Sequence, residues 1–434
     1  MNPLRFHIVF LSSAILCALA NQFPAFAEGL RAGAARVDIT PDKPVMLAGY
    51  ASRTNLSSGI HDPLSARAMA FEQDGKRLVL LALDILGFYN GTAEPLRAAI
   101  LKECRLQPSD LFLCAIHTHS APTPTLDAAK GHSNNVEYTR ALQSKLVKVT
   151  REALDRMAPA QLGTGSGASP VGANRREVVR DNAGSTRIVL GRNPHLPIDR
   201  EVQVLKLTRA HRNELIGALF AYATHSTSLG PRNFLVSGDV HGLAAQFVEK
   251  HLGAGVIAPP FAGTSGNIDP WYRVLPEFNT TNNWVPEPIL RGTLLGEEVV
   301  HVLNGIQKSV TDGVIKSAIK TVELPGKPRG EATAGATGQT TPLGLTAACI
   351  GDVAFFGMGG EIFTEIGQAI KAASPFPRTF ILTHCNGAAG YLPIRSAYPE
   401  GGYEVQSSPF APGADEQVIE EAKRMLVELR SRSE

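Results

Sequence analysis

The sequence of 434 residues is poor in cysteine, in net charge and in long apolar runs. Its five cysteines match neither a zinc ribbon nor a C-x-x-C motif, which argues against a disulfide scaffold. The formal net charge is only +2, without long runs of one sign, so no nucleic-acid-binding surface is expected. Beyond the first residues, no stretch has the apolar length of a membrane span. The motif G-x-S-x-G is missing, which argues against a serine hydrolase with a nucleophile elbow.

The first residues have the pattern of a signal peptide. Arg5 supplies a positive charge, an apolar stretch covers residues 8–20, and Ala25-Phe26-Ala27 fits an A-x-A cleavage site. We therefore expect residues 1–27 to be a signal peptide and residues 28–434 to form one catalytic domain. The mature chain is expected to be secreted or periplasmic.

Apolar β-like runs alternate with amphipathic helical stretches along the chain. This alternation predicts an α/β fold, with a mixed β-sheet core flanked by helices. Strands are expected at residues 29–41, 77–85, 111–116, 203–208, 215–223, 346–350, 354–357 and 379–383. Helices are expected at residues 94–104, 142–157 and 288–306, after residue 363 and around residues 418–429. The segments 168–182 and 326–341 are predicted to be loops.

Two histidines follow the apolar run 111–116. Residues i and i+2 of a strand share one face, so His117 and His119 are expected to project together from its C-terminal end. Open α/β sheets place their sites at such ends. Paired imidazoles are a common start for a zinc site or an acid/base pair, the alternative being two hydrogen-bonded histidines. His225 ends a second apolar strand, which favours a ligand role over simple packing.

Charged residues at other junctions leave two interpretations each. Asp84, near a strand end, either orients a metal-bound histidine or is an exposed acid. Arg175 and Arg176, in a polar segment, are either solvated or hold a substrate carboxylate or carbonyl. Glu361 follows two glycines at a strand-to-helix junction, where it either binds a metal or caps the helix.

Several short motifs, taken in order, resemble the neutral, non-lysosomal ceramidases in their N-terminal catalytic domain. They are His117-Thr118-His119-Ser120, Asn174-Arg175, His225, Gly360-Glu361, Cys385-Asn386, Tyr391 and Tyr403-Glu404. The resemblance implies one catalytic Zn²⁺ bound by His117, His225, Glu361 and Tyr391, with a metal-activated water that cleaves the N-acyl amide bond of ceramide. It further implies that His119 donates a proton to the leaving amine, and that Arg175 and Tyr403 hold the carbonyl or the developing oxyanion.

The chain departs from the family pattern at Asp269. The family signature Gly-Asp-Val-Ser-Pro-Asn reads here Gly266-Asn267-Ile268-Asp269-Pro270-Trp271, so a serine nucleophile is excluded at that position. A carboxylate there could instead contact an amine or hydroxyl of a different substrate. The family's C-terminal β-sandwich is also expected to be absent.

We therefore expect a zinc-dependent amidohydrolase acting on ceramide or a related N-acyl lipid. Two alternatives remain open: a metal-dependent hydrolase of another bond, such as an ester, and a non-catalytic exported binding protein on the same scaffold. The expected partner is a small lipid or N-acyl molecule, which allows a peripheral contact with a membrane.

Overall fold

The computed structural model describes residues 29–210, 212, 214–253, 255–271, 287–328 and 339–431. The expected signal peptide, residues 1–27, lies outside the described residues, and so does the part of the expected loop at 329–338. Within the described part of the chain, no helix combines the length and the apolar character needed to cross a bilayer.

The largest element is an eight-stranded mixed sheet. Its strands are, in spatial order, β13 (Pro260–Ala262), β11 (Leu215–Tyr222), β10 (Glu201–Arg209), β6 (Ala158–Ala168), β1 (Arg31–Asp38), β3 (Ser65–Gln73), β4 (Lys76–Leu83) and β5 (Leu111–Ala115). The β11–β13 and β4–β5 pairs are parallel, while the other pairs in this sheet are antiparallel. The strands expected at residues 203–208 and 215–223 are confirmed as β10 and β11, which form an antiparallel pair.

A four-stranded sheet packs against one face of the large sheet. It consists of β15 (Ile315–Pro325), β16 (Thr340–Ile350), β17 (Val353–Met358) and β19 (Arg378–Leu382). One hydrophobic cluster joins the two sheets, with Phe71 and Phe112 from the large sheet meeting Phe355 and Phe380 from the smaller one. Because each sheet needs cover for an apolar face, this interior fixes how the sheets stack.

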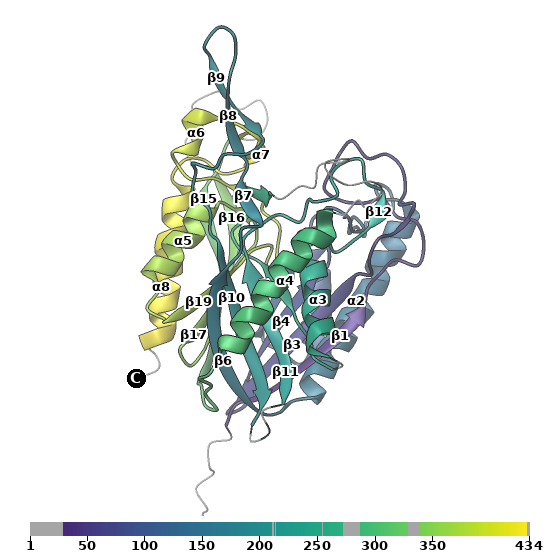
Figure 1. Cartoon of the computed structure of the whole chain (residues 1–434), viewed down its shortest axis with the longest axis vertical. Helices are drawn as coiled ribbons and strands as arrows, with labels where there is room; N and C mark the ends of the chain where they lie inside the picture. Colours follow the sequence, from purple (N-terminus) through teal and green to yellow (C-terminus); the bar gives the residue numbers. More distant parts are fainter. Residues whose placement is uncertain are drawn as a thin grey trace, which may run out of the picture.

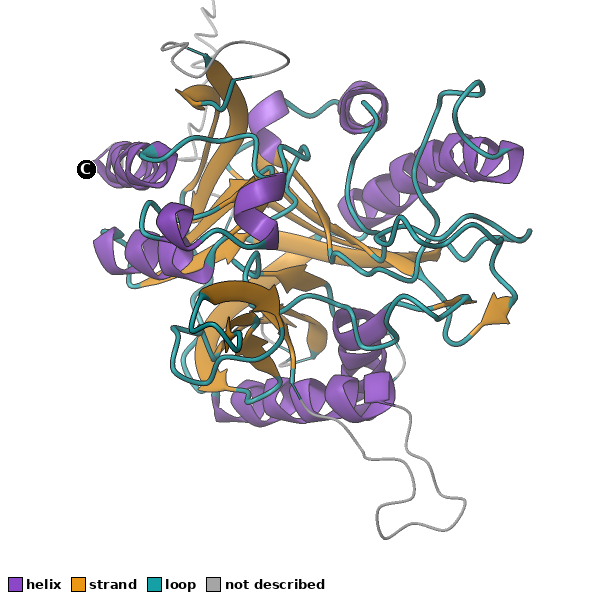
Figure 2. Cartoon of the chain, turned by 90° about the horizontal axis from the view of Figure 1, so that it is seen from above, coloured by secondary structure: helices purple, strands orange, loops and turns teal. Residues whose placement is uncertain are grey.

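Helices cover the outer faces of both sheets, as Figure 2 shows from above. Over the large sheet lie α1 (Ala93–Cys104), α2 (Ser133–Asp155), α3 (Asp239–Leu252) and α4 (Glu287–Gly305). Over the small sheet lie α5 (Thr364–Ala373) and α8 (Ala414–Ser431). The shorter η1 (Pro108–Asp110), α6 (Ala397–Glu400) and α7 (Tyr403–Ser407) complete the helices of the described residues. The result is a four-layer arrangement, which agrees with the expected mixed sheet flanked by helices.

Short strand pairs at one end of the sheets hold the connecting loops in place. They are β2 (Gly59–Ile60) with β12 (Leu235–Val236), β7 (Gly172–Asn174) with β14 (Ile268–Pro270), and β18 (Glu361–Ile362) with β20 (Tyr391–Leu392). The prediction of a loop over residues 168–182 is wrong. That segment contains β7 and the first strand of a hairpin, β8 (Arg176–Arg180) with β9 (Thr186–Leu190), which projects at the top of Figure 1.

Candidate metal centre

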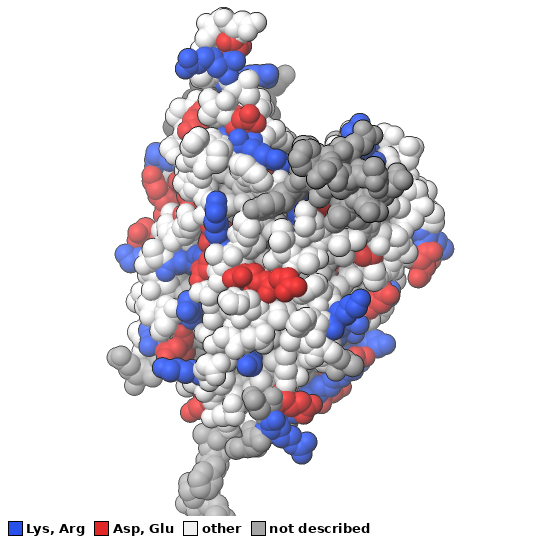
Figure 3. All heavy atoms as spheres, in the orientation of Figure 1, with Lys and Arg blue, Asp and Glu red and all other residues white. Residues whose placement is uncertain are grey.

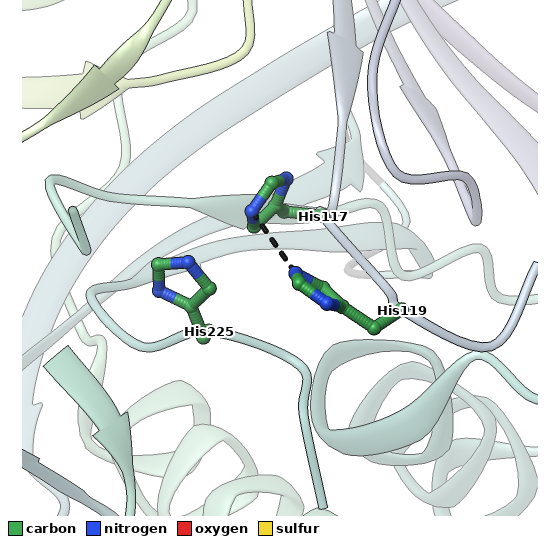
Figure 4. A group of neighbouring side chains, drawn as sticks. All are labelled: His117, His119 and His225. Atoms are coloured by element: carbon green, nitrogen blue, oxygen red, sulfur yellow. Dashed lines mark hydrogen bonds between the residues drawn. The ribbon is translucent and has the colours of Figure 1, made fainter. Parts of the chain in front are cut away.

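His117 and His119 are brought together by an irregular backbone rather than by strand periodicity. Strand β5 ends at Ala115, and His117 adopts a left-handed conformation with φ of 61°. The prediction that the two histidines project together because they share a strand face is therefore wrong about the cause. Their Nε2 atoms nevertheless lie 3.3 Å apart (Figure 4). The backbone N–H of His119 donates to Ser226 at 3.1 Å, which ties this turn to the segment after β11.

His225 reaches the same point from the end of β11. The ring nitrogens of His117, His119 and His225 that could bind a metal all lie within 4.8 Å of one another. Figure 4 shows the three rings arranged around a common centre. His225 is fully buried, so its position is set by the packing around it.

Glu361 adds a carboxylate to the three imidazoles. Its Oε2 atom lies 3.3 Å from Nε2 of His117 and 3.4 Å from Nε2 of His225. That oxygen is buried and has no hydrogen-bond partner among the described residues, whereas Oε1 accepts the hydroxyl of Tyr89 at 2.9 Å. Burial alone would raise the pKa of Glu361, but the approach of His117 and His225 outweighs it and places the pKa well below its ordinary value. The carboxylate is therefore ionised.

These separations suit a tetrahedral metal site. Ligand atoms at about 2.0–2.1 Å from zinc are about 3.3–3.4 Å from one another in a tetrahedron. The distances from Glu361 Oε2 to the two Nε2 atoms, 3.3 and 3.4 Å, equal such an edge. A cation at this centre would also satisfy the unpaired, buried Oε2 atom. The donor set thus fits zinc, and His117, His225 and Glu361 are the residues that would hold it.

The second ring nitrogens distinguish His119 from the other two histidines. Nδ1 of His117 donates to the carbonyl of Leu86 at 2.7 Å, and Nδ1 of His225 donates to that of Ser265 at 2.8 Å. Because a carbonyl can only accept, Nδ1 carries the proton of each neutral ring, and its Nε2 then presents a lone pair to the centre, as metal ligands do. Nδ1 of His119 is buried and has no partner in the part of the chain that the structure describes. His119 therefore lacks the support that is typical of a ligand.

The ring of His119 is only partly exposed to solvent. Burial, followed by the neighbouring His117 and His225, lowers the pKa of His119 well below its ordinary value. The ring of Tyr50 lies 4.9 Å from that of His119, centroid to centroid. The imidazole is therefore neutral in this environment.

Arg175 contacts residues from several segments around the metal centre. It is buried, not solvated, and its Nε donates to Glu404 at 2.7 Å. Its Nη1 contacts Nε2 of His225 at 3.3 Å and Oδ1 of Asp269 at 3.2 Å. Its Nη2 donates to the carbonyl of Gly266 at 2.9 Å and to the hydroxyl of Tyr391 at 3.2 Å. All five N–H groups of the guanidinium thus have a partner.

Tyr391 and Tyr403 lie side by side next to this arginine. Tyr391 pairs with Glu361 through the parallel β18–β20 bridge, which places both predicted ligands on neighbouring strands. The rings of Tyr391 and Tyr403 meet edge to face, with centroids 5.6 Å apart. Tyr391 is buried, whereas Tyr403 is 48% exposed. Tyr403 therefore borders the site from the solvent side.

Neither interpretation of Asp84 is correct. Its side chain is fully buried, not exposed. It accepts the backbone N–H of Ser65 at 2.8 Å and binds the guanidinium of Arg67 at 3.2 Å. Arg67 also binds Glu249 at 2.8 Å. Asp84 is thus part of a buried ion-pair network centred on Arg67. The residue stabilises the fold rather than orienting a histidine of the site.

Three residues of the site were given no role by the sequence analysis. The ring of His384 stacks on that of His117 with centroids 3.9 Å apart, and its buried Nε2 has no partner within the described ranges. His384 comes just after β19, the same signal of a histidine after an apolar strand that identified His225. Tyr89 and Tyr50 lie in loops, where no periodic signal marks them.

The sequence profile described as neutral/alkaline non-lysosomal ceramidase, N-terminal, matches residues 30–263. That range is more than half of the chain. The chain belongs to this family. The matched range includes His117, His119, Arg175 and His225, while Glu361 reaches the same centre from beyond it.

Named relatives agree with this membership. The chain is 28% identical over 279 residues to neutral ceramidase of Pseudomonas aeruginosa, covering 61% of this chain and 41% of the relative. It is 27% identical over 231 residues to neutral ceramidase 1 of Arabidopsis thaliana, covering 50% and 28%. The chain thus spans less than half the length of these relatives.

Solved ceramidase structures have the same fold. A crystal structure of neutral ceramidase from Pseudomonas aeruginosa matches with a TM-score of 0.78 at 21% identity, covering 93% of this chain and 75% of that one. A structure of ceramidase complexed with C2 matches with a TM-score of 0.75 at 20% identity, covering 93% and 76%. The four-layer arrangement is therefore the fold of the ceramidase family.

Proposed function

We propose that this protein is a zinc-dependent amidohydrolase that cleaves the N-acyl amide bond of ceramide or of a related N-acyl lipid. Membership of the ceramidase family supports the reaction class. One observation carries the proposal: the buried, unpaired Oε2 of Glu361 lies 3.3–3.4 Å from two imidazole nitrogens with fixed lone pairs. Zinc, when bound, supplies a Lewis acid that lowers the pKa of a coordinated water to about 7.

The proposed ligands are His117, His225, Glu361 and Tyr391. Two imidazoles, a carboxylate and a phenol form an N/O donor set of the kind that zinc accepts. The hydroxyl of Tyr391 faces Arg175, at 3.2 Å from its Nη2, and interacts with Glu361. It is thus close to a proposed ligand from the neighbouring strand.

His119 is the group placed to move a proton. Its Nε2 lies 3.3 Å from that of His117, so it reaches the centre without a supporting partner that would fix it as a ligand. A neutral imidazole can accept a proton at one step and deliver it to the leaving amine at the next. Such proton transfer is typically worth about 10²–10⁴-fold in rate.

Arg175 and Tyr403 are proposed to hold the substrate carbonyl. When Nε2 of His225 binds a metal, its lone pair is no longer an acceptor for Nη1 of Arg175. One N–H of the guanidinium then becomes available for a developing oxyanion. Asp269, which is 34% exposed and bound to the same Nη1, can contact a hydroxyl or amine of the substrate.

A lipid surface is the proposed source of the substrate. The β8–β9 hairpin begins directly after Arg175 and projects from the molecule (Figure 1). Val178 and Leu190 on it are 56% and 53% exposed, and Arg180 and Arg187 are exposed near its tip. Figure 3 shows basic groups near the tip of the projecting hairpin, with an acidic group beside them. Apolar side chains beside arginines suit a shallow contact with an anionic membrane.

Matched substrates test the proposal. N-acyl sphingosine and an ester with the same acyl chain would be compared before and after chelation. We expect amide cleavage that is lost on chelation and restored by zinc. Cleavage of the ester alone would instead support the alternative hydrolase, which Asp269 motivates because it replaces the family's serine. Full activity in metal-free protein would refute the proposed chemistry.

A further inference from the structure

Two buried cysteines face each other between the sheets, behind the metal centre. Cys114 lies on β5, the edge strand of the large sheet, and Cys385 follows β19, the edge strand of the small one. The two residues form an isolated antiparallel bridge. Both are 1% exposed, and both are free thiols.

The backbone around this bridge defines the type of pair. The backbone N–H of Ala115 donates to the carbonyl oxygen of His384 at 3.2 Å, and the backbone N–H of Asn386 donates to the carbonyl oxygen of Leu113 at 2.8 Å. The hydrogen bonds thus flank the cysteines, which makes them a non-hydrogen-bonded pair with Cα atoms about 4.5 Å apart. Disulfides span Cα separations of about 4.4–6.8 Å, so the bridge lies within reach of a bond.

Both side chains lie in the hydrophobic cluster that joins the two sheets, and the neighbouring thiol of Cys385 contributes to the raised pKa of Cys114. Gly357 makes room for them, because a Cβ at that position would lie 2.5 Å from Sγ of Cys385.

We propose that Cys114 and Cys385 form a disulfide bond when the chain folds in an oxidising compartment. The bond would join the strand that leads into His117 to the segment that carries His384 and leads to Tyr391. It would therefore hold together the two segments, one beside each sheet, that carry His117 and His384. This crosslink does not depend on the proposed hydrolase activity.

The reaction is a two-electron oxidation. Two S–H bonds break and one S–S bond forms, and the two protons and two electrons pass to a disulfide oxidant, such as oxidised glutathione, which becomes two thiols. Burial and the contact with Cys385 raise the pKa of Cys114 well above its ordinary value. Because the thiolate is the reacting form, the bond should form during folding, before the pair is covered.

Peptide mapping tests the crosslink in the full chain. The protein would be exported to the bacterial periplasm, denatured with an alkylating reagent and digested with trypsin without reduction. We expect peptides 106–130 and 379–395 to appear as one species, two hydrogens lighter than their sum, that separates on reduction. Alkylation of both cysteines in these two peptides would overturn the proposal.

Variants assign the bond and measure its effect. The double variant Cys104→Ala/Cys349→Ala should keep the linked peptide, and Cys385→Ala should lose it and leave Cys114 open to alkylation. The melting temperature of the exported wild type should fall by about 5 °C or more on reduction, whereas that of Cys385→Ala should not change. An equal response of the wild type and Cys385→Ala to reductant would contradict the proposed constraint.

Discussion

At the scale of single residues, the contacts of Nδ1 separate two kinds of histidine in one cluster. His117 and His225 donate from Nδ1 to backbone carbonyls, and His119 does not. A fixed tautomer serves a ligand, whereas a ring without this support is free to exchange a proton at its accessible nitrogen. This difference between the histidines leads to a test that separates metal binding from catalytic turnover.

The change His119→Gln is expected to keep the metal and lose activity. Turnover should fall by about 10²–10⁴-fold because proton transfer is removed while His117, His225 and Glu361 remain. His117→Gln, the matched control, should lose both the metal and activity. Metal content and turnover would be recorded on the same samples. A His119→Gln protein without metal would make His119 a ligand instead.

His241 predicts a pH dependence of stability. It is fully buried, with its Nε2 at 3.1 Å from the carbonyl of Tyr222, and burial lowers its pKa to about 4. In the unfolded chain the pKa is about 6.5. Since the folded value is the lower one, the contribution of His241 is present above pH 6.5 and is lost as the pH falls towards 4.

Denaturant unfolding at pH 7 and pH 4.5 measures this contribution. The wild type should lose about 2 kcal/mol more stability between these pH values than His241→Gln, because glutamine does not bind the proton. The other buried histidines contribute equally to both proteins and cancel. An identical pH dependence of the two proteins would exclude the assignment.

At the scale of elements, the sequence predicted regular segments better than the turns between them. Long apolar runs gave β4, β5, β10, β11, β17 and β19, and amphipathic spacing gave α1, α2, α4 and α8. The short strands β7 and β8 were missed because three to five residues carry too little periodicity. The left-handed turn at His117 has only a weak signal in its residue type, since histidine is enriched at positive φ but still rarely adopts it.

Gly49 shows how such a loop controls the site. Its φ is 95°, and a Cβ there would lie 2.3 Å from Nδ1 of His119. Gly49→Ala should therefore displace His119 and lower turnover by about tenfold or more, with the metal retained. Gly91→Ala is the matched control, because its φ is 72° but no atom of the described residues lies within 4 Å of the added Cβ. Equal loss of activity in both variants would trace the effect to backbone strain alone.

At the scale of the whole molecule, the site is a product of sheet stacking. His117 and His225 come from the large sheet, while Glu361 and His384 come from segments beside the small one. The family resemblance supplied Glu361 and Tyr391, whose proximity no local pattern predicts. It could not supply the stacking of His384 on His117 or the full set of partners of Arg175, because these depend on how distant segments pack.

The projecting hairpin gives a prediction at the same scale. Val178→Asp combined with Leu190→Asp should slow hydrolysis of substrate in anionic vesicles by about tenfold or more, because two apolar side chains no longer enter the interface. Hydrolysis of a soluble short-chain substrate should not change. Val427→Asp, at an exposed apolar position on α8, is the matched control. Equal slowing on both substrates would place the effect in the site rather than at the membrane.

The most direct test of the account is a zinc titration of chelator-treated protein, followed by its activity on N-acyl sphingosine. We predict one zinc ion per chain, with activity returning in proportion to occupancy. Glu361→Gln should bind zinc at least about tenfold more weakly, while Glu420→Gln, exposed on α8, should behave like the wild type. Undiminished zinc affinity in Glu361→Gln, or hydrolysis that does not follow zinc occupancy, would contradict the account.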